Sequence, residues 1–455
     1  MADIETIPTI PSTPSPASAP TPVKAQKNPI WWTNATFFVA MHIVAFVGAV
    51  WLSPWSTLKR QTLVLAFVSW QLASFGITLG YHRLWSHKAF SANLPLRVVL
   101  AIMGSLGFQG SIKWWVLRHR LHHRFTDDPE HDPYAASRGL LYSHMGWIFW
   151  KPKYDRLALI EKGDLERDPV VRFQHRYYIP IALFFGLACP TIIATAWGDA
   201  LGGYIWGGVI ARLVIWHCTF MINSLAHWEG LQPYSRDMSA RGDLILAVLT
   251  NGEGNHNFHA FPQDFRNGPY PLDWDPTKWV IWLLYKCTPF VPRIRVTPEP
   301  DVLKARARVL EEEADLDGTD GAKKEELRKK AAKLRAMVPP QAWGTPEEKL
   351  ETWGRKQLQN YVENGRRKVL LIDGCIIDIT SYMKDHPGGS SILTKFLAMP
   401  TVAETVHDSG VDIGESDNAV LPFKDATIAF HGGFNNHSSA AKEKLKVLRV
   451  ARLVN

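Results

Sequence analysis

The chain has 455 residues and a formal net charge of +8, which is long enough for more than one domain. That charge would suit nucleic acid or an anionic membrane surface. Long apolar runs between residues 30 and 290 favour a membrane and an anionic substrate, so we expect no nucleic-acid partner. The scattered cysteines form no C-x-x-C pair, which argues against a disulfide or zinc framework and indicates a reducing, cytosol-facing setting; they are Cys189, Cys218, Cys287 and Cys375.

The first residues, 1–28, are rich in Pro, Ser, Thr and Ala and hold almost no large apolar side chains. Such a segment cannot bury enough surface to offset its ordering entropy, so we expect a disordered tail. It lacks the charged start and apolar stretch of a signal peptide. The first apolar run, from about Phe37 to Trp55, is therefore interpreted as an internal membrane anchor.

Four apolar runs in the predicted membrane domain, residues 29–298, are long enough to cross a bilayer, which takes about 20 residues of helix. The runs are 34–54, 61–81, 178–198 and 202–224. Turn residues pair them into two hairpins, and the excess of Lys and Arg predicts that both termini lie in the cytosol. The apolar segment 95–117 carries Arg97 and Lys113, so we expect an interfacial helix there and not a fifth span.

The composition changes after residue 298. Residues 299–344 are rich in Glu, Lys, Arg and Ala, which predicts solvated helices that link two domains. Residues 345–455 have mixed helix and strand character and no spanning segment. The predicted fold is mainly α: four transmembrane helices under a cytosolic helical cap, followed by a small α+β domain.

Histidines gather in four clusters, and each cluster follows the cytosolic end of an apolar element. They are H-R-L-W-S-H (His82, His87), H-R-L-H-H (His119, His122, His123), N-S-L-A-H (Asn223, His227) and G-E-G-N-H-N-F-H (His256, His259). Positions i, i+3 and i+4 share one helix face, so the members of a cluster can point together. Neutral imidazole binds iron, zinc or copper, and eight such ligands suit two ions. We therefore predict two metal ions in one pocket just outside the bilayer.

The remaining histidines of the membrane domain stand alone in the sequence. We interpret them as polar residues at the membrane interface; they are His42, His144, His175 and His217.

The histidine motifs, together with Y-S-H-M-G-W, resemble those of the acyl-CoA delta-9 desaturases (stearoyl-CoA desaturase family) over about residues 30–295. The resemblance implies two iron ions, dioxygen, and insertion of a cis double bond at the ninth carbon of a saturated acyl-CoA. It carries the metal ligands over to the eight clustered histidines and gives Asn223 the role of holding one metal through water. The third motif departs from the family's H-N-F-H-H, because Ala260 replaces the last histidine. A water, Glu253 or His131 could take its place.

A saturated acyl chain needs a narrow, dry tunnel beside the metals. Trp70 and Ser74 lie about 18 and 12 Å before His82 on one helix face, and Trp70 is our candidate for the tunnel's closed end. Trp115 is a candidate for the tunnel wall. The phosphates of CoA need cations on the cytosolic side. The candidates are Lys113, Arg118, Arg120, Arg124, Lys151 and Lys153. Positive-inside topology alone would also account for each of these cations.

The C-terminal unit contains D-H-P-G-G, D-A-T-x-x-F and H-S-x-x-A, which together resemble cytochrome b5. The resemblance implies haem b with His386 and His437 as axial ligands, a closed site that passes electrons. His431 is expected not to be a ligand. The interval between the ligands holds extra sequence around 397–422, including His407, which we interpret as a surface insertion.

The fusion of the two halves resembles fungal-type desaturases, in which the electron donor is tethered at high effective concentration. It implies that electrons pass from NADH through a separate cytochrome b5 reductase to the haem and then to the irons, in the endoplasmic reticulum membrane. Two alternatives remain open. One is a desaturase of different position or a fatty-acyl hydroxylase, and the other is a catalytically silent membrane haem protein.

Overall fold

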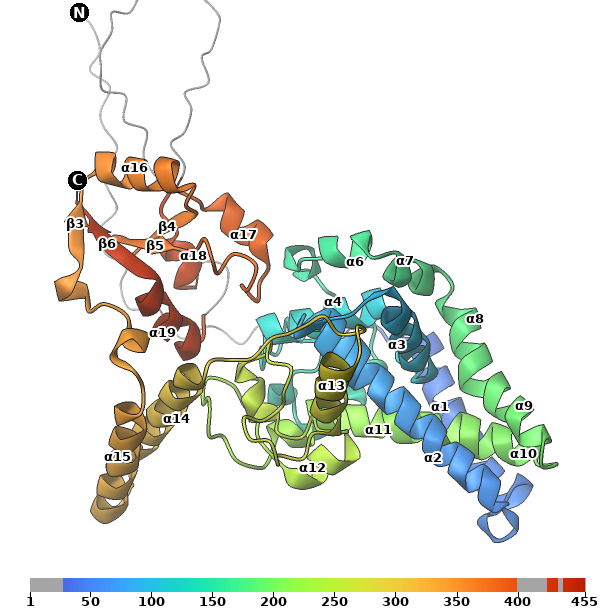
Figure 1. The fold of residues 1–455 in the computed structure, drawn as a ribbon. Coiled ribbons are helices and arrows are strands. Elements are labelled where there is room, and N and C mark those ends of the chain that lie inside the picture. The colour runs from blue at the N-terminus through green and yellow to red at the C-terminus, as the bar shows by residue number, and fades with distance from the viewer. Residues whose placement is uncertain (1–27, 399–423, 433–436, 455) are drawn as a thin grey trace, which may run out of the picture.

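The computed structural model describes residues 28–398, 424–432 and 437–454. The expected disordered tail, except for its last residue, lies outside the described residues, as does nearly all of the predicted insertion at 397–422 with His407. Figure 1 shows a helical body that continues through a helical pair into a smaller unit with a sheet.

Four helices are long and apolar enough to cross a membrane. They are Trp32–Leu52 (α1 and its extension), Arg60–Ser86 (α2 and η3), Tyr178–Thr195 (α8 to α9) and Ala200–His227 (α10 to η9). The four predicted spans are thus confirmed within a few residues at most ends. The second helix continues beyond the predicted end at 81, and this continuation carries His82.

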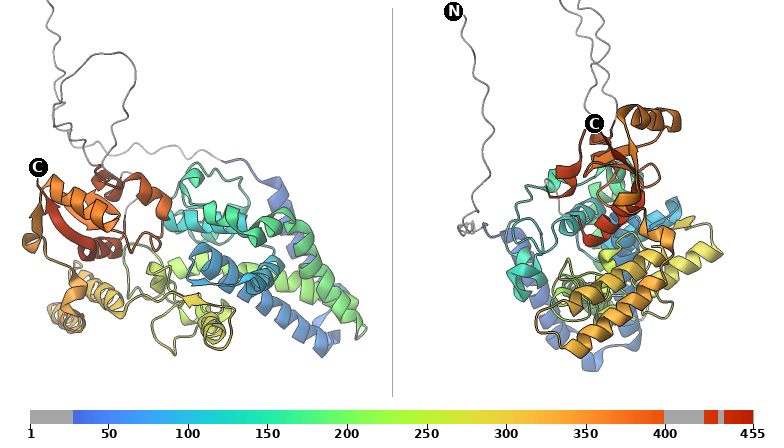
Figure 2. Two further views of the ribbon diagram at one scale, coloured as in Figure 1. Left: turned by 45° about the horizontal axis from the view of Figure 1, so that its top comes forward. Right: turned by 90° about the vertical axis from the view of Figure 1, so that its left-hand side faces the viewer.

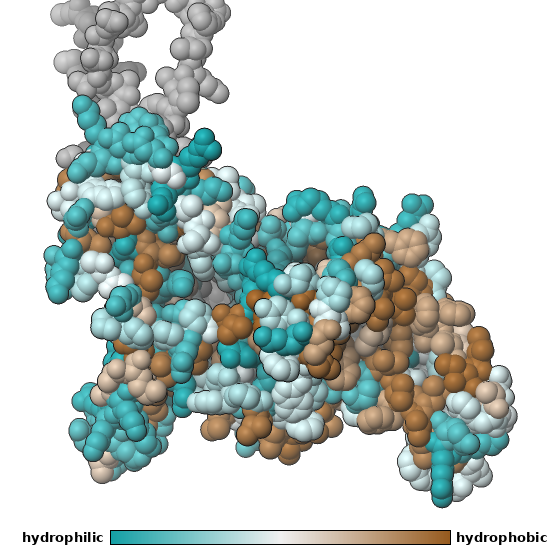
Figure 3. Space-filling model, in the orientation of Figure 1, coloured by the Kyte–Doolittle hydropathy of each residue, from teal (hydrophilic) through white to brown (hydrophobic). Residues whose placement is uncertain are grey.

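The spanning helices expose large apolar side chains along their outer faces, for example Phe46, Phe67, Ile179 and Ile192. Figure 3 shows the resulting hydrophobic surface over the end of the molecule that these helices form. Such a surface is unfavourable in water and suits lipid, while the helical backbone satisfies its own hydrogen bonds. The chain is a multi-pass membrane protein.

The predicted single interfacial helix at 95–117 is wrong in its bounds, because the segment forms two helices. These are α3 (Leu94–Leu106) and α4 (Ile112–Arg124). The break falls at Gly110, whose φ of +94° suits glycine, and Ser111 then caps α4 by accepting a hydrogen bond from the Trp114 amide. The separate second helix orients its histidines independently of the apolar helix before it.

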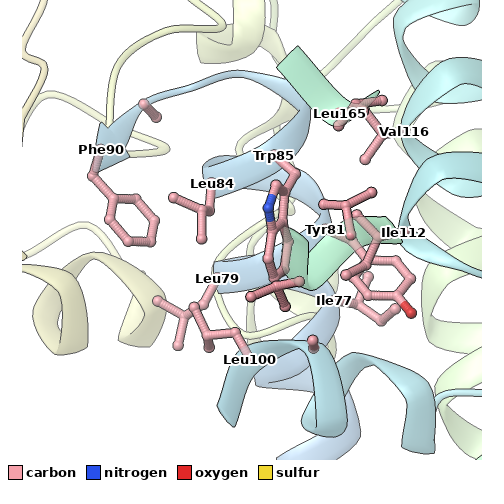
Figure 4. Packing of buried hydrophobic residues seen from close by; sticks show 14 of the residues in the cluster. Ile77, Leu79, Tyr81, Leu84, Trp85, Phe90, Leu100, Ile112, Val116 and Leu165 are labelled. Carbon is pink, nitrogen blue, oxygen red and sulfur yellow. The ribbon is translucent and has the colours of Figure 1, made fainter. Parts of the chain in front are cut away.

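Helix η3 (Gly76–Ser86) packs closely against α3, and the contact has almost no room for side chains at its centre. A Cβ atom on Gly76 would overlap the backbone at Gly104, and a Cβ atom on Gly104 would overlap the Tyr81 ring. Around this contact lies the largest apolar cluster, in which Tyr81 and Trp85 pack with Leu100 (Figure 4). This packing fixes the position of η3 along its axis and its rotation about that axis, and therefore the position of His82.

Two helices, α14 (Glu299–Ala314) and α15 (Gly321–Ala336), form the predicted linker. The interpretation of both as solvated is wrong for α14, because Val302 is buried against Tyr234 and Phe258 of the membrane part. The described residues after the linker form one sheet in the order β3-β6-β5-β4. Its strands are β3 (Glu351–Trp353), β4 (Val369–Ile372), β5 (Cys375–Asp378) and β6 (Arg449–Leu453).

Helices cover the sheet and complete the C-terminal unit, as both views in Figure 2 show. They are α16 (Arg355–Gly365), α17 (Ser390–Lys395), α18 (Thr427–Phe430) and α19 (Ser439–Leu448). Strands β4 and β5 join through Asp373 and Gly374, both with positive φ, in a tight hairpin. A second apolar cluster, including Ile377, Met383 and Leu445, lies under the sheet.

We predict that Gly76→Ala destabilises the membrane part by about 1–3 kcal/mol, because the added methyl group meets backbone that cannot move aside. Thermal unfolding in detergent measures the change. The matched control is Gly321→Ala, also in a helix but with open space around the new Cβ, which should leave the midpoint unchanged or raise it. Equal midpoints for the two variants would contradict the packing argument.

Candidate metal centre

Seven buried histidines form two groups in which ligand nitrogens converge. The first group is His82, His87, His119 and His259, and the second is His122, His227 and His256; within each group the nitrogens lie within 4.8 Å of one another. His123 adjoins the first group, with its Nε2 3.1 Å from Nε2 of His119. The structure thus brings together all eight predicted histidine ligands.

Local helix geometry distributes the ligands between the groups. On α4, His119 faces the first group while His122 faces the second, because successive positions on one helix face diverge slightly. His256 and His259 lie one turn apart on the short helix η10 (His256–Ala260), and their rings stack at 5.4 Å between centroids. Two neighbouring elements therefore supply one ligand to each group, which holds the groups side by side.

Polar partners orient several rings from behind. Nδ1 of His122 lies 2.8 Å from Oδ1 of Asp132, and Nδ1 of His227 lies 2.7 Å from Oγ of Ser239. Ser239 is itself held by Asp127. Outer partners of this kind fix the ring orientation and tautomer of metal-binding histidines and leave Nε2 free for the ion.

Burial keeps most of these rings neutral. Desolvation, with the neighbouring imidazoles, holds the pKa of His87, His119 and His259 well below the usual range. For His122, burial works in the same direction but Asp132 outweighs it and raises the pKa. Neutral imidazole is the form that binds metal, so the donor set fits two metal ions.

A buried ionic network supports the first group. Arg83 is 2.8 Å from Glu253 and 2.9 Å from Asp275, and Oε2 of Glu253 is 3.2 Å from Nδ1 of His82. Burial alone would raise the pKa of Glu253, but Arg83 and His82 lower it to about 2. Glu253 is therefore ionised, and its carboxylate lies beside Nδ1 of His82.

An apolar cavity of about 470 Å³ reaches the first group. His119, Asn223 and Trp115 line both this cavity and a smaller one beyond it, which Ser74 and Glu253 also line. The Trp115 ring stacks on His119 at 4.8 Å. Asn223, Trp115 and Ser74 thus line one cavity. Trp70 lines neither cavity but lies one turn before Ser74, next to the apolar cluster that includes Ile215.

The predicted cations differ in their partners. Arg120 is bound by both oxygens of Asp164 at 2.6 and 2.9 Å, and Lys113 pairs with Glu166 at 3.1 Å. Arg118 stacks on Trp114, and Lys151 is exposed. Arg176, which the sequence did not single out, lines the larger cavity. It is the last residue of α7 (Pro169–Arg176), in a stretch rich in basic residues, so the sequence did not distinguish it from its neighbours.

The structure distinguishes the side chains that could replace the histidine missing from the third motif. Nδ1 of His131 lies 3.0 Å from Asp128, and the ring belongs to neither group. Glu253 lies behind His82, on the side away from its Nε2, which is 3.1 Å from Nε2 of His259. Ala260 closes η10 and brings no donor.

The interpretation of His42, His144 and His217 as isolated interface residues is wrong, because they form a chain. Nε2 of His42 lies 3.1 Å from Nε2 of His217, whose Nδ1 lies 3.0 Å from Nε2 of His144. Nδ1 of His144 lies 3.0 Å from Oγ of Ser224, the residue after Asn223. Because the three lie on separate elements, sequence spacing could not bring them together.

In the C-terminal unit the rings of His386 and His437 face each other with centroids 6.4 Å apart. Nδ1 of each ring lies near a backbone carbonyl, that of Gly389 at 3.0 Å and that of Phe430 at 2.8 Å, which leaves both Nε2 atoms free. With a metal–imidazole bond of about 2 Å on each side, one iron fits between them. His431 instead bonds Asp373.

Comparison with known proteins identifies the family. The model of the family described as "Fatty acid desaturase" matches residues 61–263. The "Probable acyl-CoA desaturase" of Schizosaccharomyces pombe is 34% identical, over 98% of this chain and 84% of its own length. The chain belongs to the fatty acid desaturase family. As a fatty acid desaturase it is an enzyme, an oxidoreductase.

Two further relatives cover a shorter part of this desaturase. The "Delta(9)-fatty-acid desaturase fat-5" of Caenorhabditis elegans is 38% identical over 54% of this chain and 76% of its own length. The "Acyl-CoA Delta(11) desaturase" of Trichoplusia ni is 38% identical over 52% of this chain and 68% of its own length. These matches are about as long as the membrane part alone.

We predict that His227→Ala lowers the iron content from roughly two to roughly one per chain, because it removes a ligand of the second group only. Inductively coupled plasma mass spectrometry of the purified protein measures it. His131→Ala is the control and should keep the wild-type content, since its ring is paired with Asp128. A loss of iron in His131→Ala equal to that in His227→Ala would contradict the assignment of ligands.

Proposed function

We propose that this desaturase inserts a cis double bond at the ninth carbon of a saturated fatty acyl-CoA, with two iron ions and dioxygen. The observation that carries the proposal is the pair of buried histidine groups at the inner end of an apolar cavity. Iron bound there supplies the oxidising power that removes hydrogen from an unactivated methylene. The protein supplies the ligands, a dry site and a fixed position for the chain.

The cavities give the acyl chain its path. We propose that the chain occupies the larger cavity, passes His119 and Asn223, which line both cavities, and ends towards Ser74 and Ile77. The apolar walls exclude water from the reacting carbons, and Asn223 stays available to hold a metal-bound water. We propose Trp70 as the end of this path because it packs one turn beyond Ser74. Lys113, Arg118 and Lys151 remain our candidates for the CoA phosphates.

Electrons reach the metals from the C-terminal unit, which we propose binds haem b between His386 and His437. The facing rings and their free Nε2 atoms support this role. NADH–cytochrome b5 reductase is the proposed source of electrons, and the endoplasmic reticulum membrane, with both termini cytosolic, is the proposed location. The donor's covalent link makes each transfer independent of diffusion between proteins.

Ala260 leaves the third motif without its last histidine, but other side chains still support the first group. Glu253 orients His82, and His123 stands beside His119 as an additional imidazole. We propose that His123 completes the first group. The Delta(11) relative favours one alternative, the same reaction at a different carbon, which product analysis distinguishes.

The function predicts growth of a desaturase-deficient yeast strain without added oleate when this chain is expressed. Gas chromatography of the fatty acids should show a double bond at carbon nine, whereas carbon eleven or a hydroxyl group would indicate the alternatives. His119→Ala, which removes a ligand beside the cavity, should not support growth. A chain that is made in normal amount and does not support growth would contradict the function.

Exchange of Trp70 for alanine should shift the products towards longer acyl chains, because it opens space beyond Ser74. The product distribution in the same strain measures the shift. Val64→Ala, at an exposed position of the same helix, is the matched control and should leave the distribution unchanged. An unchanged distribution in Trp70→Ala would mean that another residue closes the path.

A further inference from the structure

The turn that carries His386 lies directly against the membrane part of the chain. Nη2 of Arg295 is 3.2 Å from Oδ1 of Asp385 and donates to the carbonyl of Lys384 at 3.3 Å. The Arg295 amide in turn donates to the carbonyl of Ala89, two residues after His87. Both Asp385 and Ala89 thus stand within two residues of a histidine of their own site, and one arginine joins them.

A glycine makes the second contact of this turn. Gly389 has a φ of +87°, and a Cβ atom there would overlap the carboxylate of Glu161. Its carbonyl is also the partner of Nδ1 of His386, so the residue that orients the ring also touches the membrane part. On the other side of the site, Ser439 bonds Asp237 through its amide (2.8 Å) and hydroxyl (2.9 Å), two residues after His437. Figures 1 and 2 show α17 beside the segment that leads into α6 (Gly163–Arg167).

Arg124 lies between the two sites and has hydrogen-bond donors that are not used. It is the last residue of α4 and follows His123 directly. Its Nη1 donates to the carbonyl of Leu159 at 3.0 Å, while its buried Nε has no hydrogen-bond partner. Within residues 28–398, 424–432 and 437–454, no carboxylate lies within ion-pair distance of this guanidinium. An unpaired, half-buried cation of this kind raises the free energy of the folded protein unless an anion binds to it.

A short series of contacts leads from the guanidinium to the histidine pair. Its partner Leu159 stands two residues before Glu161, and the Glu161 carboxylate lies against Gly389, whose carbonyl is the partner of Nδ1 of His386. A haem bound between these rings would place its carboxylate groups at the edge of the site. Arginine binds carboxylates with two parallel hydrogen bonds.

We propose that Arg124 binds a carboxylate of the haem held by His386 and His437 and joins that haem to the metal centre through the last turn of α4. The proposal rests on the proposed function. In each transfer one electron leaves ferrous haem, which becomes ferric, and reduces one metal ion by one unit of charge. Arg124 keeps its proton and positions the donor. This assignment takes Arg124 out of the candidates for the CoA phosphates.

The test compares the full-length wild-type chain with Arg124→Gln, after haem and iron content confirm that both are loaded. Potentiometric titration should give a lower haem reduction potential in Arg124→Gln, because loss of the positive charge favours ferric haem. The lower potential by itself would favour loss of the electron, so slower reoxidation would report the lost positioning of the haem. In stopped-flow mixing of the reduced protein with stearoyl-CoA and oxygen, we expect haem reoxidation to slow about tenfold. The KM for stearoyl-CoA should not change.

Two variants complete the design. Arg156→Gln removes a neighbouring exposed cation that bonds His131, and it should match the wild type in potential and rate. Arg124→Lys keeps the charge and should restore both towards wild-type values. Three results would overturn the proposal while leaving the desaturase assignment intact. They are a normal potential and rate in Arg124→Gln, an effect on KM alone, and an Arg124→Lys chain as slow as Arg124→Gln. A wild-type chain that binds no haem would overturn both the proposal and the haem donor of the proposed function.

Discussion

Eight imidazole rings lie together at one end of the spanning helices, and the structure around them keeps them buried and oriented. Protonated rings at this density would repel one another, so the site is stable only with neutral rings that share a cation. The surroundings serve that arrangement. The second spanning helix continues to Ser86 and so carries His82, α4 is separate from α3 and turns three rings inward, and Asp132, Ser239 and Glu253 lie behind the rings.

In the proposed function, the same arrangement connects the metal centre with the acyl chain and with the C-terminal unit. The cavity ends where Trp115 stacks on His119, so an acyl chain that fills it passes the first group. At its other end, α4 stops at Arg124, which bonds Leu159, two residues before the Glu161 that lies against Gly389. One helix of thirteen residues, Ile112–Arg124, thus contributes to the cavity wall, to both histidine groups and to the proposed haem contact.

Much of this followed from the sequence because it depends on local patterns. Apolar length predicted the spans, and spacing on one helix face predicted that His119, His122 and His123 would act together. The break before α4 was missed because an apolar average conceals a single glycine with positive φ at Gly110. The chain from His42 through His217 to His144, and the pairing of Arg295 with Asp385, join elements far apart in the sequence, and no local pattern encodes such contacts.

The most direct test of the account is the location of the metals in the purified enzyme. Anomalous scattering at the iron edge, from crystals of the full-length chain, would show it. The account predicts two iron peaks, one among His82, His87, His119 and His259 and the other among His122, His227 and His256. A single peak, or peaks outside these rings, would contradict it.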